Sequence, residues 1–334
     1  MDMISEIKNG NKRAAARLIS MIENKEREAA EILKECWSYQ TKSRVIGITG
    51  PPGSGKSTLT DQLAKHLLNK NKKIGIIAVD PSSPITGGAF LGDRVRMSDL
   101  NGEPGIFIRS MGTRGALGGI SKAVHGAVRV LEVFGMDYIF IETVGVGQSE
   151  VDVAGISDTL VLVTIPGMGD DIQVEKAGIL EVADIIVVNK ADHENANKTI
   201  QYLKSLLFLN SGHVPDKPGI QIASTIATSG VGIAELMSAI DDHCGQLIKS
   251  GKAKKLQSER LKSELLDLIS SRFREQFGEY DFLTGATDKS IESILGSEAN
   301  PYSEASILLK DFIEWRSYDV KENRSPGNSS ERST

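Results

Sequence analysis

One eight-residue segment constrains the fold of this chain more than any other. Residues 50–57 read Gly-Pro-Pro-Gly-Ser-Gly-Lys-Ser and match the pattern G-x-x-x-x-G-K-[S/T] at every fixed position. An apolar, β-branched run at 45–49 precedes the segment, and a helical pattern with leucines on one face follows it at 58–68. Strand, glycine-rich loop and helix in this order indicate a phosphate-binding P-loop.

In a P-loop, backbone N–H groups and the N-terminus of the following helix surround a chain of phosphates. Lys56 is expected to reach the β- and γ-phosphates and to act in catalysis, and the Ser57 hydroxyl is expected to bind Mg²⁺. The residues expected to contact the nucleotide here are Gly50, Pro51, Pro52, Gly53, Ser54, Gly55, Lys56, Ser57 and Thr58.

The rest of the chain alternates between short apolar runs and helical patterns. Further buried strands are expected at 74–79, 138–141, 160–163, 185–188 and 220–223. Near-continuous apolar strands separated by helices predict a mostly parallel sheet covered by helices. The predicted fold class is therefore α/β, a P-loop NTPase of the G-domain, SIMIBI-like type. Ligands of such sheets bind at the carboxyl ends of the strands.

A second motif, Asn189-Lys190-Ala191-Asp192, directly follows the expected strand 185–188. The Asp192 carboxylate can accept hydrogen bonds from N1–H and the 2-amino group of guanine, and adenine does not offer this pair of donors. Hydrogen-bond mismatches of this kind discriminate by roughly 10⁴-fold. The motif therefore predicts a guanine nucleotide, with Lys190 packed along the base and Asn189 holding the loop. The following strand end adds Ile226, Ala227 and Thr228, whose backbone N–H groups are expected near the guanine oxygen.

Acidic residues at strand ends are expected to complete a magnesium site. Asp80 ends the strand 74–79, Asp93 lies in the glycine-rich loop that follows, and Glu142 ends the strand 138–141. Mg²⁺ at a nucleotide takes one or two carboxylates together with phosphate oxygens and water. The residues expected to hold it are Ser57, Asp80, Asp93 and Glu142.

The run at 142–145 also bears on hydrolysis, because it has the shape of D-x-x-G with glutamate in place of aspartate. The Gly145 N–H is expected to bind the γ-phosphate. Many signalling GTPases carry a water-orienting glutamine directly after this glycine, but Val146 occupies the position here. Gln148 lies two residues further on. Glu142 and Gln148 are both candidate catalytic residues. With Pro52 stiffening the loop near the γ-phosphate, we expect slow hydrolysis.

Helical patterns flank the nucleotide-binding region. They run through residues 3–40 on one side and through 233–248, 256–277 and 303–315 on the other. The expected organisation is an N-terminal helical segment (1–43), a P-loop GTPase domain (44–250), a C-terminal helical extension for dimerisation (251–320) and a disordered tail (321–334).

Composition argues against several other functions. The net charge of −5 does not favour non-specific binding of nucleic acid. No run of about 18 apolar residues is present, so no transmembrane helix is expected. Neither nucleic acid nor a membrane is expected as a partner. The charged start of the chain lacks a signal-peptide core, and the two cysteines have no paired spacing. These features predict a cytoplasmic protein.

Arginines cluster around the expected loops of the nucleotide site: Arg94, Arg96, Arg109 and Arg114. The sequence is compatible with three roles for them. One arginine acts as an internal arginine finger, or the group faces a partner, or the arginines form ordinary surface ion pairs.

Together these motifs resemble those of a known family. The P-loop, residues 80–84, residues 142–150 and residues 189–192 are similar to those of the methylmalonyl-CoA mutase-associated GTPases, once labelled an arginine/ornithine transport kinase. The similarity covers roughly residues 8–250 and includes the segments 166–173 and 176–181.

This resemblance implies a slowly hydrolysing GTPase, with GTP, GDP and Mg²⁺ as ligands, that acts as a chaperone of an adenosylcobalamin-dependent acyl-CoA mutase. Such chaperones gate cofactor loading, protect or restore the mutase, and are homodimers joined through C-terminal helices. The segment matching 165–176 is a switch that signals to the mutase. Lys176 falls on its lysine and is a further candidate catalytic residue. Asp80, Asp93 and Glu142 fall on the family's magnesium-site acids.

Two other functions share part of this pattern. Metal-insertion GTPases have the same P-loop and sheet, but they use cysteine- or histidine-rich metal motifs, which the sequence lacks. A P-loop kinase that passes the γ-phosphoryl group to a protein would need a catalytic base placed for an acceptor hydroxyl. The sequence shows no such arrangement.

Overall fold

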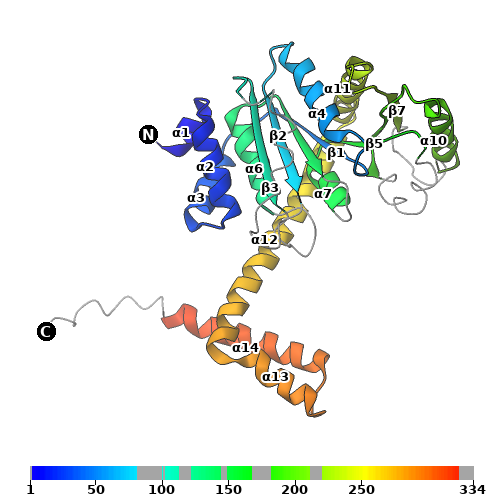
Figure 1. Ribbon diagram of the computed structural model, residues 1–334. Coiled ribbons are helices and arrows are strands. Elements are labelled where there is room, and N and C mark those ends of the chain that lie inside the picture. Colours follow the sequence, from blue (N-terminus) through cyan, green and yellow to red (C-terminus); the bar gives the residue numbers. More distant parts are fainter. Residues whose placement is uncertain are drawn as a thin grey trace. The chain divides into compact units, whose positions relative to one another are not determined.

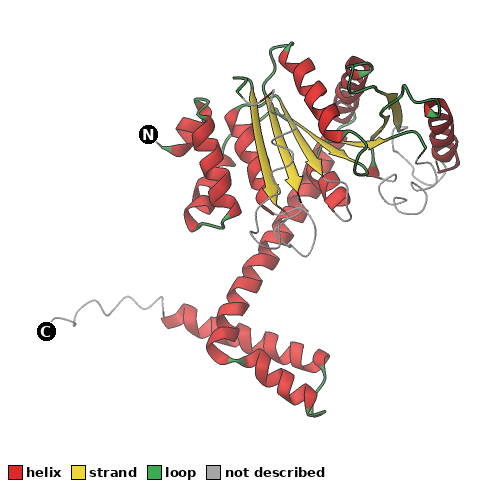
Figure 2. Ribbon diagram, viewed as in Figure 1, coloured by secondary structure: helices red, strands yellow, loops and turns green. Residues whose placement is uncertain are grey.

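The structure is a computed structural model that describes residues 2–80, 100, 102–112, 122–143, 149–167, 182–210 and 220–322. The chain divides into two compact units, Met1–Leu256 and Gln257–Thr334 (Figure 1). The first unit holds a β-sheet with helices on both faces, and the second is entirely helical where it is described (Figure 2).

All neighbouring strands of the seven-stranded sheet run parallel, which confirms the predicted fold class. The strand order is β3-β2-β4-β1-β5-β6-β7. The strands are β1 (Arg44–Thr49), β2 (Ile74–Asp80), β3 (Ile106–Gly112), β4 (Tyr138–Thr143), β5 (Thr159–Thr164), β6 (Ile185–Val188) and β7 (Gln221–Ser224).

Strand β3 is an addition to the strands expected from the sequence. Its apolar run covers only 106–108, since the polar residues Arg109 and Ser110 follow directly. This short run is weaker than the continuous apolar runs of the other strands. Among the described strands β3 pairs only with β2, at one edge of the sheet, so it tolerates polar residues that a central strand would exclude.

The two faces of the sheet bury separate apolar clusters. Along β2, Ile74 and Ile76 contribute to one cluster and Ile77 and Val79 to the other, as the alternation of side chains in a strand requires. Helices α4 (Lys56–Leu68) and α11 (Ile233–Lys249) cover the first face. The opposite face is covered by α6 (Lys122–Phe134), α7 (Ser149–Ile156) and α10 (Ala196–Asn210). The helices α1 (Met3–Lys8), α2 (Lys12–Glu23) and α3 (Arg27–Cys36) belong to the same apolar cluster and pack against α6.

The region expected to be helical from 3 to 40 consists of three helices separated by two short turns. Gly10 and Lys25 have positive φ angles, 82° and 57°, which end the regular helix at each turn. The Asn11 side chain then caps α2 by accepting from the Arg13 and Ala14 N–H groups at 3.0 and 3.2 Å.

The second unit is built from α12 (Lys252–Thr284), whose first residues belong to the first unit, α13 (Ala286–Leu295) and α14 (Pro301–Glu322). Its core is an aromatic cluster in which Phe312 lies 5.3 Å from Phe273 and Tyr280 lies 5.6 Å from Trp315, between ring centroids. No described helix of either unit combines the length and apolar character needed to cross a bilayer.

Candidate nucleotide site

The P-loop joins the carboxyl end of β1 to α4, and its glycines are needed for close packing. Gly50 and Gly55 have φ angles of 141° and 89°. A Cβ atom at Gly50 would lie 2.0 Å from the Val163 carbonyl oxygen, and one at Gly55 would lie 2.4 Å from the Asn189 side-chain nitrogen. The loop therefore takes this path only with glycine at both positions.

The Lys56 ammonium lies against the P-loop backbone. Its Nζ donates to the carbonyl oxygens of Gly50 and Pro51 at 2.8 and 3.0 Å. The side chain is buried although Lys56 is the first residue of α4. A positive charge thus stands beside the loop and the positive end of the helix, an arrangement that favours a bound anion.

A hydroxyl and two carboxylates gather at the carboxyl edge of the sheet. The Ser57 Oγ donates to Glu142 Oε1 at 2.5 Å. Asp80 and Glu142 are only 5% and 3% exposed, and the pairing of Ala78 with Glu142 puts both acids on the sheet face covered by α4. Hard oxygen ligands of this kind fit Mg²⁺. Asp93, the fourth expected ligand, lies outside the described residues.

Asn189 connects the P-loop to both segments expected to recognise the base. Its Nδ2 donates to the Ser54 carbonyl oxygen at 2.8 Å. Its Oδ1 accepts from the Thr225 hydroxyl and from the Ala227 N–H, each at 3.1 Å. Asn189 is 2% exposed, so these bonds are shielded from water. The Thr225 hydroxyl was not expected in this role, and only its position at a strand end hints at it.

The remaining base-recognition residues lie around this centre. Lys190 has a φ angle of 56°, and the next residue, Ala191, donates its N–H to the Thr225 carbonyl oxygen at 3.0 Å. Asp192 and Thr228 are exposed, as is Lys190. A β-bridge between Ile226 and Val231 closes the turn. The structure thus brings the two expected base-binding segments together beside the P-loop.

Several expected site residues lie outside the described residues: Gly145, Gln148, Lys176 and Asp93. Of the four clustered arginines, Arg109 is described. Its guanidinium donates to Glu23 and, at 3.0 Å, to the Ser20 hydroxyl, both in α2. Arg109 therefore ties the edge strand to the N-terminal helices.

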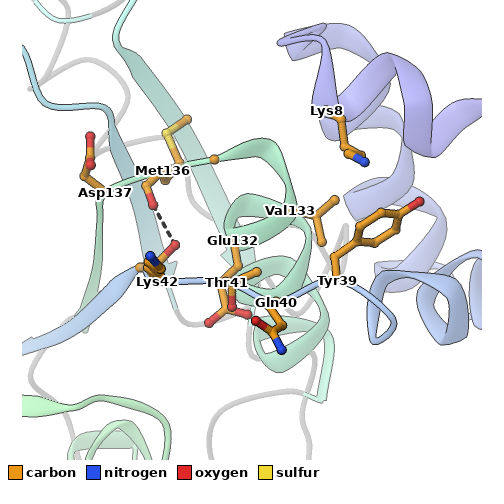
Figure 3. Close-up of a pocket in the computed structure, with 11 residues that line it drawn as sticks. Lys8, Tyr39, Gln40, Thr41, Lys42, Glu132, Val133, Met136 and Asp137 are labelled. Atoms are coloured by element: carbon orange, nitrogen blue, oxygen red, sulfur yellow. Dashed lines mark hydrogen bonds between the residues drawn. The ribbon is translucent and has the colours of Figure 1, made fainter. Parts of the chain in front are cut away.

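A cavity of about 300 Å³ lies away from these residues, at the amino ends of β1 and β4 (Figure 3). Ser43 donates to the Met136 carbonyl oxygen at 2.6 Å on one side, and the Lys8 ammonium lies 4.2 Å from the Tyr39 ring centroid on another. Burial raises the pKa of Glu132 in its wall, and the bond from Arg129 partly offsets this rise. Because nucleotides bind at the carboxyl ends of parallel strands, this cavity is not the nucleotide site.

Comparison with known proteins agrees with this geometry. The family described as "Methylmalonyl Co-A mutase-associated GTPase MeaB" matches residues 15–280. A protein of Pyrococcus abyssi is 44% identical over 93% of this chain and 96% of its own length. The GTPase ArgK of Escherichia coli is 31% identical, with coverage of 95% and 98%.

Two further similarities extend this result. The methylmalonic aciduria type A homolog of Mus musculus, a mitochondrial protein, is 31% identical over 91% of this chain and 77% of its own length. A crystal structure described as an LAO/AO transport system kinase superimposes with a TM-score of 0.66 at 24% identity, covering 93% of this chain and 96% of that one. At that identity the superposition shows the P-loop NTPase fold alone. The family match and the curated relatives show more: this chain is a GTPase of the MeaB family of methylmalonyl-CoA mutase-associated GTPases.

Proposed function

We propose that this protein is a GTP-dependent chaperone of an adenosylcobalamin-dependent acyl-CoA mutase. In this role it gates loading of the cobalamin cofactor and protects or reactivates the mutase. The family description and the mouse relative's name supply the mutase and the metabolic context. The structural observation that carries the proposal is the Asn189 centre, because it holds a phosphate-binding loop and a guanine-type recognition loop in one site.

In this proposal each part of the site has a separate task. Lys56 and the N–H groups of residues 50–58 bind the phosphates, and Asp192, Lys190 and residues 226–228 recognise guanine. Ser57, Asp80, Asp93 and Glu142 would hold Mg²⁺, which when bound neutralises charge on the β- and γ-phosphates. Gly145 would distinguish GTP from GDP through the γ-phosphate.

Hydrolysis is proposed to be slow in the isolated protein. Val146 replaces a water-orienting glutamine, and Pro52 restrains the P-loop. Glu142 and Gln148 are the further candidate catalytic residues for GTP hydrolysis, besides Lys56. The docked mutase would order the segment 165–176, including Lys176, near the nucleotide, and so set the rate.

The same proposal includes a homodimer that is joined through residues 251–320. It also places the protein in the cytoplasm. Helix α12 carries Leu261, Leu265 and Leu268 at four- and three-residue spacing, and these side chains are 41–58% exposed in the single chain. Such spacing is typical of a seam between helices. Sustained apolar exposure of this kind marks an interaction surface.

The test of this function is GTP hydrolysis by the protein alone and with a cobalamin-dependent acyl-CoA mutase. We expect slow hydrolysis alone and stimulation by the mutase of up to about 10³–10⁵-fold, the range seen when a partner supplies a missing catalytic group. Lys176→Ala should lose the stimulation, whereas Lys204→Ala, an exposed lysine in α10, should keep it.

Two results would contradict parts of this proposal. Fast hydrolysis by the lone protein would refute the argument from Val146. Full stimulation of the Lys176 variant would remove that segment as the route from the mutase to the nucleotide.

A further inference from the structure

Strand register places Ser110 in the same row of the sheet as the magnesium-site acid Glu142. Ala78 of β2 pairs with Ser110 of β3 on one side and with Glu142 of β4 on the other. Residues that pair across parallel strands project from the same face. Ser110 therefore faces the side of the sheet that is covered by α4 and that carries the P-loop lysine and Ser57.

The Ser110 hydroxyl is buried and lacks a hydrogen-bond partner among the residues that the structure describes. A buried hydroxyl without a partner costs about 1–3 kcal/mol. On an edge strand an alanine would avoid this cost. We therefore expect the Ser110 hydroxyl to gain a hydrogen-bond partner when nucleotide and Mg²⁺ occupy the site.

Among the acids of the described strands on that face, Asp80 is the nearest to Ser110 by register, and only small residues lie between them. Asp80 pairs with Gly112, and Ser110 pairs with Ala78, so neither intervening position carries a large side chain. With strands about 4.8 Å apart and a rise of about 3.3 Å per residue, the Cα atoms of Ser110 and Asp80 are about 8 Å apart. Two short polar side chains and one water molecule span this distance.

We propose that Ser110 is a further positioning residue of the magnesium site, whose hydroxyl holds the Asp80 carboxylate through one ordered water. The inference rests on the proposed function, because it takes Asp80 to be a magnesium ligand. Groups that hydrogen-bond to a ligating carboxylate fix its orientation and strengthen metal binding. Ser110 would act in this way without touching the nucleotide or the ion.

The test measures Mg²⁺ binding directly, by calorimetric titration of the full chain with a non-hydrolysable GTP analogue bound. Ser110→Ala should raise the half-saturating Mg²⁺ concentration by about 10-fold, the lower end of the range for residues that support a ligand. Ser110→Thr keeps the hydroxyl and should restore the wild-type value. The control Ser43→Ala removes a hydroxyl bonded to Met136 at the opposite edge of the sheet and should leave Mg²⁺ binding unchanged.

Asp80→Asn, measured in parallel, separates failure of this inference from failure of the magnesium site. If Asp80→Asn weakens Mg²⁺ binding and Ser110→Ala does not, Ser110 has no such role. If Ser110→Thr is as weak as Ser110→Ala, packing rather than the hydroxyl is responsible, and the inference is again overturned. If neither the Asp80 nor the Ser110 variant changes Mg²⁺ binding, the magnesium site itself is wrongly assigned.

Discussion

The Asn189 side-chain amide donates to the Ser54 carbonyl oxygen at 2.8 Å, so the loop proposed to recognise guanine, residues 189–192, is bonded directly to the P-loop. The two residues are 135 positions apart in the chain. Asn189 also accepts from Thr225 and Ala227. Its single side chain thus sets the spacing between the proposed phosphate end and the proposed base end of the site.

Replacing Asn189 with alanine should weaken both folding and nucleotide binding. The change leaves a carbonyl, a hydroxyl and an N–H group without their partner, and each buried loss costs about 1–3 kcal/mol. We expect the free energy of unfolding to fall by about 3 kcal/mol or more, and GTP and GDP affinity to fall together. Urea unfolding and calorimetry measure the two effects. Asn197→Ala, an exposed position in α10, serves as control, and a stable variant with normal affinity would disprove the role of Asn189.

Replacing Asp192 with asparagine should change the preferred base from guanine to xanthine. The asparagine amide donates where the carboxylate accepted, so it mismatches the guanine 2-amino group but pairs with the 2-oxo group of xanthine. GTP affinity should fall by up to about 10⁴-fold, and xanthosine triphosphate affinity should rise. Calorimetric titration of both nucleotides is the measurement. As a control, Asp242→Asn at an exposed position should bind both nucleotides like the wild type. An unchanged base preference in Asp192→Asn would disprove the assignment of Asp192.

Replacing Glu142 with alanine should slow GTP hydrolysis while sparing much of the GDP affinity. The carboxylate accepts from Ser57 at 2.5 Å, whereas the phosphates are proposed to be bound by other groups, Lys56 and the N–H groups of residues 50–58. Single-turnover hydrolysis and GDP titration separate the two quantities. Hydrolysis at the wild-type rate would show that Glu142 is not the acid of the magnesium site.

Most of the sheet could be predicted from sequence because β1, β2, β4, β5 and β6 are largely apolar and buried along nearly their whole length. Strand β3 could not, because Arg109 and Ser110 interrupt its apolar run. Their presence is explained only by the position of β3 at the sheet edge and by the contact of Arg109 with α2. Both facts depend on residues distant in the chain.

The candidate site shows the same division. The P-loop and residues 189–192 are local patterns that follow single strands, and sequence is enough to find them. The bonds from Asn189 to Ser54 and Thr225 join three loops, and no local pattern encodes such contacts. The row that contains Ser110, Ala78 and Glu142 likewise exists only through strand order and register.

Replacing Glu23 with alanine should destabilise the protein strongly, because it leaves the Arg109 guanidinium without its carboxylate. The Glu23 and Arg109 side chains are 8% and 18% exposed, so the loss should exceed the roughly 1 kcal/mol of an exposed pair and approach about 3–5 kcal/mol, the cost for a fully buried one. The control is Glu31→Ala, which breaks the exposed pair with Lys34 and should cost about 1 kcal/mol or less. Urea unfolding compares the two. Equal small losses would show that the pair does not anchor β3 to α2.

The stability of the protein should also depend on Cys36 at high pH. Burial raises the pKa of this thiol from 9.0 to about 11, and the nearby Arg129 offsets part of the rise. Because the folded pKa is the higher one, the unfolded chain loses its proton first as the pH rises. The contribution of the neutral thiol is therefore fully present below about pH 9 and is lost by about pH 11. Over that window the loss is on the order of 3 kcal/mol.

Urea unfolding of the wild type and of Cys36→Ala at several pH values between 8 and 11 isolates this effect, since other titrating groups cancel in the difference. The stability advantage of the wild type should shrink steadily across the range. Cys244 is also buried and its pKa is raised by burial, so Cys244→Ala should show a change in the same direction. A difference between wild type and Cys36→Ala that stays constant with pH would mean that the thiol ionises as readily in the folded protein as in the unfolded chain.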